Sequence, residues 1–279
     1  MKTNNKTLAL KVSLFCFILF INGCAGSESS DGSFGTDTDG TKTGTTGNHS
    51  KFAQAGDSLY VISGKNMHLY DVSTANNPKL DARIDLKREV SSLLTYEDKL
   101  IITSAKGIYL FDNPAPNNPV FQSKINNIAG CSGVQIKDNY LYESISETAC
   151  DDNDYASTLP TSQQNILRTL DITSLTDPVQ VDSFNMFDPK SIALDRNLLF
   201  ACDGTTGLKL FDISNPELMV KESFSDEIEY SDLIAQKIDN TTGRLTAVTK
   251  THIIQYQYNL TTKVVIKINQ MQIKSTPSL

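Results

Sequence analysis

Residues able to hold a metal ion gather at one place in the chain. Asp151, Asp152 and Asp154 lie within four positions, and Tyr155 follows them. Closely spaced carboxylate oxygens are the hard ligands that Ca²⁺ takes. The loop lacks the spacing, the glycine and the distant glutamate of an EF-hand, so a solvated acidic loop is the alternative interpretation. We therefore expect no cofactor, and Ca²⁺ at this loop is the one metal for which the sequence offers a candidate site.

Few other residues could carry catalysis. The chain has three histidines, and no two of them have the spacing of metal ligands. It contains no His-Glu-x-x-His motif and no Gly-x-Ser-x-Gly turn for a serine nucleophile. The sequence therefore favours a binding protein over an enzyme.

The first 50 residues predict export and a flexible tether. Residues 1–11 carry three lysines and no acid, and ten residues with one polar member follow at 12–21. This is the pattern of a signal peptide, predicted here over 1–23, and the apolar run is shorter than a bilayer-spanning anchor needs. Residues 24–50 are mainly Gly, Ser, Thr and Asp, which cannot bury enough apolar surface to fold. The remaining domain, 51–279, carries the fold.

The chain is acidic, which bears on its partners. Its formal charge is −7, and losing Lys2, Lys6 and Lys11 with the signal peptide while all 32 acidic residues remain brings it to about −10. We therefore expect no nucleic acid as a partner.

Residues INGCA at 21–25 resemble the lipobox of bacterial lipoproteins. The resemblance implies that Cys24 becomes the lipid-modified N-terminus, carrying acyl chains such as palmitate. Several acyl chains give stable anchoring, whereas one binds a membrane only marginally. Ala25 is not the aspartate that retains lipoproteins in the inner membrane of enterobacteria. The implied location is the outer membrane or cell surface, lipid-anchored and facing the periplasm or the exterior.

A repeat of about 41 residues organises the rest of the chain. Apolar segments that end in an aspartate recur, with Asp-to-Asp spacings of 41, 59 and 41; the aspartates are Asp71, Asp112, Asp171 and Asp212. A second marker, an aspartate just before an apolar strand, keeps the same phase at Asp57, Asp98, Asp138 and Asp195. A fifth, degenerate unit follows, with Gln257 where the first aspartate would be. Such a period is typical of repeat architectures.

Each unit contains four short strands in about 40 residues, as a propeller blade does. We expect Asp71, Asp112, Asp171 and Asp212 to form turns by accepting a hydrogen bond from the backbone two residues on. The sequence thus predicts an all-β, five-bladed propeller of four-stranded antiparallel blades, whose units close into a ring. A two-sheet sandwich is the alternative fold, and a sixth blade would need strands in the third unit's insertion or at the C-terminus.

The pattern GLKLFDISNP at 207–216 resembles the LVIVD repeat of bacterial and archaeal cell-surface proteins. The resemblance covers about residues 52–225 and, less closely, the rest of the chain. It implies a propeller on the cell surface and no defined activity.

The third unit carries about 18 extra residues between its second and third strands. In a propeller such a loop shares a face with the links between blades, and Cys131 and Cys150 should both lie there. The oxidising exterior then favours a Cys131–Cys150 disulfide. Cys202 ends a second strand and is expected to be a buried thiol, although pairing with Cys131 or Cys150 is the alternative.

Two functions follow from this arrangement. One is a monomeric, non-catalytic binding or scaffolding propeller for a protein or glycan, whose recognition surface includes Glu143, Tyr155, Asp203 and Lys106 beside the insertion. The other is a propeller hydrolase or lyase, such as a metal-dependent lactonase, with its site at the central channel. The first strands of the units are largely apolar or hydroxylic, which favours binding.

Overall fold

The computed structural model describes residues 50–87, 90–104, 107–115, 117–126, 131–146 and 165–273. All of them belong to one compact unit, Gly32–Leu279. They form twenty β-strands and a 3₁₀ turn, η2 (Gly204–Thr206). No helix in these ranges has the length and apolar character to cross a membrane.

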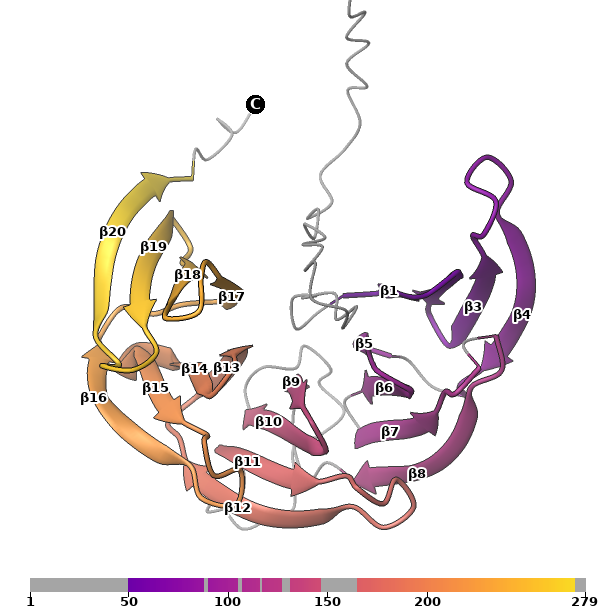
Figure 1. Ribbon diagram of the computed structural model, residues 1–279, viewed down its shortest axis with the longest axis horizontal. Helices are drawn as coiled ribbons and strands as arrows, with labels where there is room; N and C mark the ends of the chain where they lie inside the picture. Colours follow the sequence, from indigo (N-terminus) through magenta and orange to yellow (C-terminus); the bar gives the residue numbers. More distant parts are fainter. Residues whose placement is uncertain are drawn as a thin grey trace, which may run out of the picture. The chain divides into compact units, whose positions relative to one another are not determined.

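The strands form five antiparallel sheets of four, each built from consecutive strands, which we number as blades 1 to 5 (Figure 1). Blade 1 contains β1 (Phe52–Ala55), β2 (Ser58–Ser63), β3 (Asn66–Asp71) and β4 (Lys79–Asp85). Blade 2 contains β5 (Ser92–Tyr96), β6 (Lys99–Ser104), β7 (Gly107–Asp112) and β8 (Val120–Asn126). Blade 3 contains β9 (Cys131–Lys137), β10 (Tyr140–Ser146), β11 (Ile166–Asp171) and β12 (Val179–Asn185).

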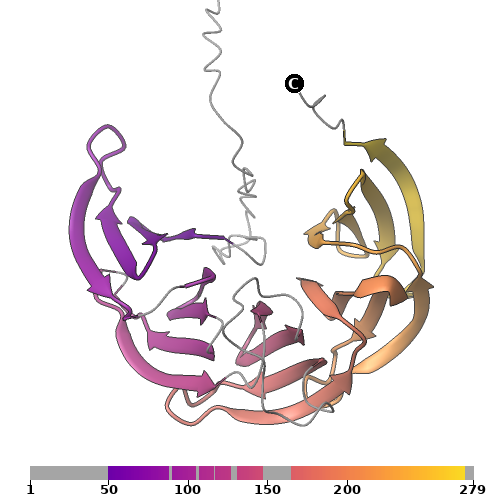
Figure 2. The same ribbon diagram turned by 180° about the vertical axis from the view of Figure 1, so that it is seen from behind.

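Blade 4 contains β13 (Pro189–Asp195), β14 (Leu198–Asp203), β15 (Leu208–Asp212) and β16 (Val220–Asp226). Blade 5 contains β17 (Asp232–Lys237), β18 (Thr242–Val248), β19 (His252–Asn259) and β20 (Val265–Gln272). In Figure 1, and from behind in Figure 2, the first strand of each blade lies innermost and the fourth outermost. The all-β fold with five four-stranded blades, predicted from the repeat, is confirmed.

Two-residue turns join the first and second strands of blades 1 to 4. Each turn begins with a residue of positive φ: Gly56 (57°), Glu97 (50°), Asp138 (56°) and Arg196 (54°). Positive φ gives a tight hairpin the twist of its flanking strands. The second repeated marker coincides with this turn. Asp57, Asp98 and Asp138 lie in the turns of blades 1 to 3, and in blade 4 Asp195 is the last residue of β13.

The first repeated aspartate ends the third strand of its blade. Asp71, Asp171 and Asp212 each accept a hydrogen bond from the backbone N–H two residues on, at 2.7–2.8 Å. Asp112 is followed two residues later by Pro114, which has no N–H to donate.

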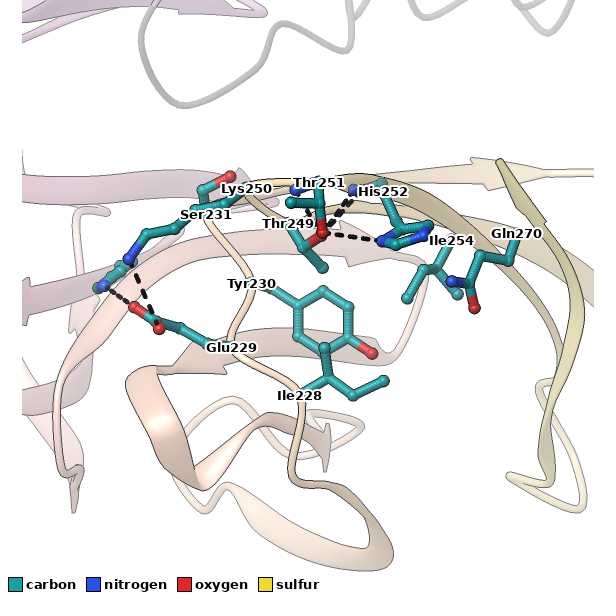
Figure 3. A pocket seen from close by; sticks show the side chains of 11 residues that line it. Ile228, Glu229, Tyr230, Ser231, Thr249, Lys250, Thr251, His252, Ile254 and Gln270 are labelled. Carbon is teal, nitrogen blue, oxygen red and sulfur yellow. Dashed lines mark hydrogen bonds and ion pairs between the residues drawn. The ribbon is translucent and has the colours of Figure 1, made fainter. Parts of the chain in front are cut away.

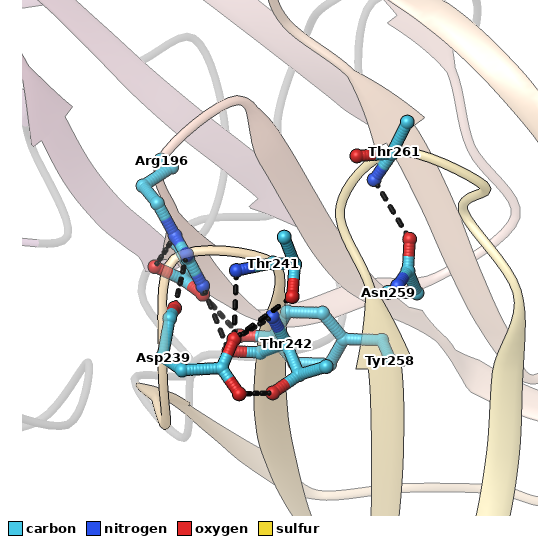
Figure 4. A network of polar contacts seen from close by, with 8 residues as sticks. Arg196, Asp239, Thr241, Thr242, Tyr258, Asn259 and Thr261 are labelled. Carbon is cyan, nitrogen blue, oxygen red and sulfur yellow. Dashed lines mark hydrogen bonds and ion pairs between the residues drawn. The ribbon is translucent and has the colours of Figure 1, made fainter.

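Blade 5 differs from the sequence expectation at this turn. Its third strand is eight residues long and ends at Asn259, two residues after Gln257. Asn259 takes the place of the repeated aspartate, because its Oδ1 accepts hydrogen bonds from the N–H groups of Thr261 (2.9 Å) and Thr262 (2.8 Å). Assigning that place to Gln257 was therefore wrong. A second turn of blade 5 uses the same device with a charged group, Asp239, and is drawn beside it in Figure 4.

Four apolar cores lie between successive blades: one between blades 1 and 2, one between 2 and 3, one between 3 and 4, and one between 4 and 5. The second strand of a middle blade therefore contributes side chains to two cores, one on each of its faces. In β14, Leu199 and Ala201 point to blade 3, whereas Leu198, Phe200 and Cys202 point to blade 5. Within the described ranges, no such core joins blade 5 to blade 1, which differs from the closed ring expected from the sequence.

Candidate functional site

Antiparallel pairing places two kinds of connection on one side of the blades. The strands of each blade alternate in direction, so the loop between the second and third strands lies on the same side as the link to the next blade. We call this side the linker face. On blades 3 to 5 it includes Ser146 at the end of β10, the links at 186–188 and 227–231, and the loops at 204–207 and 249–251.

Asp203 organises the link between blades 3 and 4. Its Oδ1 accepts hydrogen bonds from the backbone N–H groups of Phe187 (2.6 Å) and Asp188 (2.8 Å). Its Oδ2 lies 2.6 Å from Nζ of Lys209, and both side chains are buried. Buried charges of this kind are tolerated because they are paired and hydrogen-bonded. The ion pair therefore holds the link in place and presents Asp188 on the linker face.

A chain of polar contacts continues from Asp188 towards blade 5. Its Oδ1 accepts a hydrogen bond of 2.7 Å from Ser146, the last described residue before the insertion. Its Oδ2 lies 3.6 Å from Nζ of Lys190, which in turn donates a hydrogen bond of 2.9 Å to Glu229. The network thus runs from the base of the insertion in blade 3 to the link that precedes blade 5.

Lys190 and Glu229 are both charged at neutral pH. The hydrogen bond to Glu229 raises the pKa of Lys190, and the hydrogen bond from Lys190 lowers the pKa of Glu229. Lys250 adds a second cation, 4.0 Å from the other Glu229 oxygen, with a highly exposed side chain.

These residues border a pocket of about 400 Å³ at the junction of blades 4 and 5 (Figure 3). Ile228, Tyr230 and Ile254 supply apolar surface. Polar groups from β13, the link at 227–231, the segment 249–252 and β20 complete the lining. The imidazole of His252, at the start of β19, shares a hydrogen bond of 2.8 Å with the hydroxyl of Thr251. An apolar wall with a few placed polar groups is typical of sites for small ligands.

Behind the pocket, two tyrosines share one carboxylate. The hydroxyl groups of Tyr230 and Tyr256 are 2.5 Å apart, and both donate to Oδ2 of Asp226, at 3.1 and 2.6 Å. Burial raises the pKa of both phenols. They therefore stay protonated and serve as hydrogen-bond donors rather than as bases.

Two residues predicted for a recognition surface lie inside the blades. Glu143 has no exposed surface and pairs with Arg168, at 2.6 Å, within blade 3. Asp203 is 2% exposed and pairs with Lys209 as described above. Their expected place on an exposed surface is thus corrected. For Glu143 the cause is register, because it faces Arg168 on the neighbouring strand. For Asp203 it is the tight loop at 204–207, which brings its carboxylate to Lys209.

The other predicted site residues are described in part or not at all. Cys24, Lys106, Cys150, Asp151, Asp152, Asp154 and Tyr155 lie outside the described ranges, as does the signal peptide, 1–23. The backbone of Cys131 begins β9, and its side chain is not described. Cys202 is buried and unpaired, and burial raises the pKa of its thiol. Among the described residues, no three His, Cys, Asp or Glu side chains are arranged to hold a metal ion.

The sequence did not point to the pocket. Lys190 comes from the start of blade 4, Glu229 from a link and His252 from blade 5, so they are up to about 60 residues apart. None of them belongs to a repeated marker, and only the packing of two blades brings them together.

No protein-family model and no curated protein matches the chain. The resemblance to LVIVD repeats therefore rests on the repeated residues alone.

Solved structures do match it. A functionally unknown protein from Desulfotomaculum acetoxidans is 13% identical, with a TM-score of 0.61 and a match over 84% of this chain and 71% of that one. A putative 6-phosphogluconolactonase from Bacteroides uniformis is 14% identical (TM-score 0.57, 80% and 70%), and a protein from Lactobacillus plantarum is 11% identical (0.53, 77% and 67%). At such identities the likeness concerns the fold alone. This chain has the fold of propeller-like proteins.

Proposed function

We propose that this protein is a lipid-anchored, non-catalytic binding propeller whose ligand meets the linker face at the pocket between blades 4 and 5. The observation that carries the proposal is the polar network from Ser146 to Glu229, which ends at that pocket. It runs from Ser146, the last described residue before the insertion, to the pocket described above. Loops on a rigid scaffold are the usual place for binding residues.

The pKa shifts of the polar groups around the pocket support binding rather than catalysis. A general base or nucleophile needs a pKa tuned towards neutrality. Here burial raises the pKa of the Tyr230 and Tyr256 phenols further above neutrality. The hydrogen bond from Lys190 lowers the pKa of Glu229, so Glu229 stays ionised and paired with Lys190. The hydrolase alternative gains no specific support, because the likeness to a putative lactonase concerns the fold alone.

The pocket lining favours a glycan as the ligand. A sugar ring offers an apolar C–H face and a rim of hydroxyl groups. The pocket offers the apolar side chains of Ile228, Tyr230 and Ile254, and His252, Gln270 and Glu229 as hydrogen-bonding partners. Such a match of apolar and polar groups fixes the orientation of a small ligand.

A glycan array probed with the purified protein tests the binding. We expect at least one glycan to bind, and His252→Ala and Gln270→Ala to weaken its affinity about five- to tenfold, as loss of one hydrogen bond does. Thr261→Ala is the matched control, because Thr261 lies in the loop between the third and fourth strands, on the opposite side. Absence of any bound glycan, or equal affinity in all variants, would refute the proposal.

The anchor is tested separately. We expect Cys24→Ala to abolish incorporation of labelled palmitate and to move the protein from the membrane fraction to the soluble fraction. The wild-type protein should be labelled and sediment with outer membranes. Labelling that persists in Cys24→Ala would show that the lipid is attached elsewhere.

A further inference from the structure

The charged side chains of the pocket between blades 4 and 5 lie at one end of it. The lining contains two lysines and one acid, Lys190, Lys250 and Glu229, which we call the charged end. In Figure 3 Lys250 extends towards Glu229, whereas His252 and Gln270 lie at the opposite end. Two cations and one anion leave the charged end with an excess of one positive charge.

The acidic groups near the charged end are already occupied. One oxygen of Glu229 accepts the 2.9 Å hydrogen bond from Lys190. Asp188 lies 3.6 Å from Nζ of Lys190 and accepts a hydrogen bond from Ser146, and it is not one of the lining residues. Lys190 therefore serves two carboxylates of the protein, and it has little capacity left for a ligand.

Lys250 is the cation that remains available to a ligand. Its Nζ lies 4.0 Å from the second oxygen of Glu229, which is longer than a hydrogen bond, and its side chain is 86% exposed. An exposed pair at this distance contributes little energy, so the ammonium group is not committed to Glu229. Lys250 lies in the loop between β18 and β19, beside the pocket on the linker face. It therefore presents three N–H donors and a positive charge to the pocket.

We propose that the glycan bound at this pocket is anionic, and that Lys250 holds its carboxylate or sulfate group. This inference rests on the proposed function of the pocket and adds the chemical class of its ligand. A hydrogen bond that involves an ionised group is about twice as strong as a neutral one, so the acid group anchors the sugar. The sugar ring then lies against Ile228, which is 38% exposed, with its hydroxyl groups towards His252 and Gln270.

The net charge of the chain does not attract anions. It has 32 acidic and 25 basic residues, so its overall field repels an anionic ligand. At physiological ionic strength charges are screened beyond about 8 Å, so the groups within the pocket determine what binds there. The local excess of positive charge therefore selects anions at the pocket and not over the rest of the surface.

Binding of matched oligosaccharides to the full-length protein in mild detergent tests the charge requirement. The glycan array is built in pairs: oligogalacturonate and oligoalginate, each with its neutral methyl ester, and sulfated galactan oligosaccharides, each with its desulfated form. We expect at least one anionic probe to bind about tenfold more tightly than its neutral form. Its affinity should also fall as NaCl is raised from about 50 to about 500 mM. The carboxylate and sulfate pairs identify which acid group is recognised.

Substitutions at the charged end supply the second measurement. We expect Lys250→Gln to weaken binding of the anionic probe about tenfold and binding of its neutral form less than about twofold. Glu229→Gln should strengthen binding of the anionic probe about two- to fivefold, because it removes a like charge beside the ligand. Lys237→Gln is the matched control and should change neither affinity, because Lys237 is an exposed lysine of the same blade at the far end of β17, on the opposite side from the linker face.

The outcomes separate this inference from the proposed function. Neutral glycans that bind as tightly as their anionic partners overturn the inference and leave a glycan-binding propeller in place. Equal weakening of both forms by Lys250→Gln also overturns it, because Lys250 would then not recognise the charge. Failure of every glycan to bind refutes the proposed function itself, and the inference with it. The Lys250 side chain is 86% exposed, so its replacement removes no packing, and circular dichroism checks that each variant is folded.

Discussion

Glu143 and Arg168 face each other across β10 and β11 and form an ion pair in the interior of blade 3, with 2.6 Å between the glutamate Oε2 and the arginine Nη2. The glutamate has no exposed surface, and the arginine side chain is 7% exposed. Both ions have lost their hydration, so the pair is balanced only while both members are present.

We expect Arg168→Ala to lower the free energy of unfolding by about 3–5 kcal/mol, because it leaves the Glu143 carboxylate buried without a counter-charge. The double variant Glu143→Leu/Arg168→Met replaces the pair with apolar side chains of similar volume and should lose much less. Urea unfolding of the three proteins measures the difference. Equal losses in the single and double variants would mean that shape rather than charge matters at this position.

Gly207→Ala is expected to destabilise the protein by several kcal/mol. Gly207 has a φ of +83°, and a Cβ built on it would lie 1.2 Å from the backbone oxygen of Asp226, so the backbone must move. Gly64→Ala is the matched control. Gly64 also has a positive φ (+56°), but nothing lies within 4 Å of its Cβ position, so only the backbone strain of about 1–2 kcal/mol applies. Thermal unfolding that ranks the two variants equally would contradict this.

Acid should weaken the turn at Asp239 and leave the turn at Asn259 unaffected. Hydrogen bonds from Thr242 and Thr241 lower the pKa of Asp239 far below its usual value. A carboxyl group with a lowered folded-state pKa stabilises the protein above its unfolded-state pKa, near 3.9, and this contribution is lost as the pH falls towards the folded-state value.

The unfolding temperature of Asp239→Ala should therefore lie below that of the wild type at pH 7, and the gap should narrow between about pH 4 and pH 2. Asn259 accepts the same pair of backbone hydrogen bonds without a charge. The gap between Asn259→Ala and the wild type should thus stay constant over this range. Calorimetry at pH 7, 4, 3 and 2 measures both gaps, and parallel behaviour of the two variants would exclude a role for the charge.

The cysteines should divide into a disulfide and an inert thiol. We expect mass spectrometry of the unreduced protein to find Cys131 joined to Cys150, and Cys131→Ser/Cys150→Ser to lose about 3 kcal/mol of stability in the chain-entropy model. Cys202 is buried, so it should react with a maleimide only after unfolding. Rapid labelling of Cys202 in the native protein, or its appearance in a disulfide, would contradict this assignment.

Local signals in the sequence were sufficient for the blades. The repeated aspartate ends third strands because Asp71, Asp171 and Asp212 bond the backbone two residues on, which is a local property of the residue. In blade 5 that signal was weaker, since Asn259 replaces the aspartate after a longer strand. The turn was therefore placed two residues too early.

The candidate site depended on information that is not local. Glu143 and Asp203 were expected at the surface because they were placed beside the insertion, on one face of the propeller. Strand register and a tight loop instead bury each of them beside a basic residue. The pocket arises where blade 4 meets blade 5, and ring closure depends on the angle between successive blades. Neither is encoded in a repeat marker.

Because each blade packs only against its neighbours in the series, the order in which the blades unfold should follow their position. Blade 3, with two blades on each side, should exchange its amide hydrogens most slowly, and blades 1 and 5 should fray first, as terminal units of repeat arrays do. Deuterium uptake measured blade by blade tests this order, and uniform exchange across the five blades would contradict it.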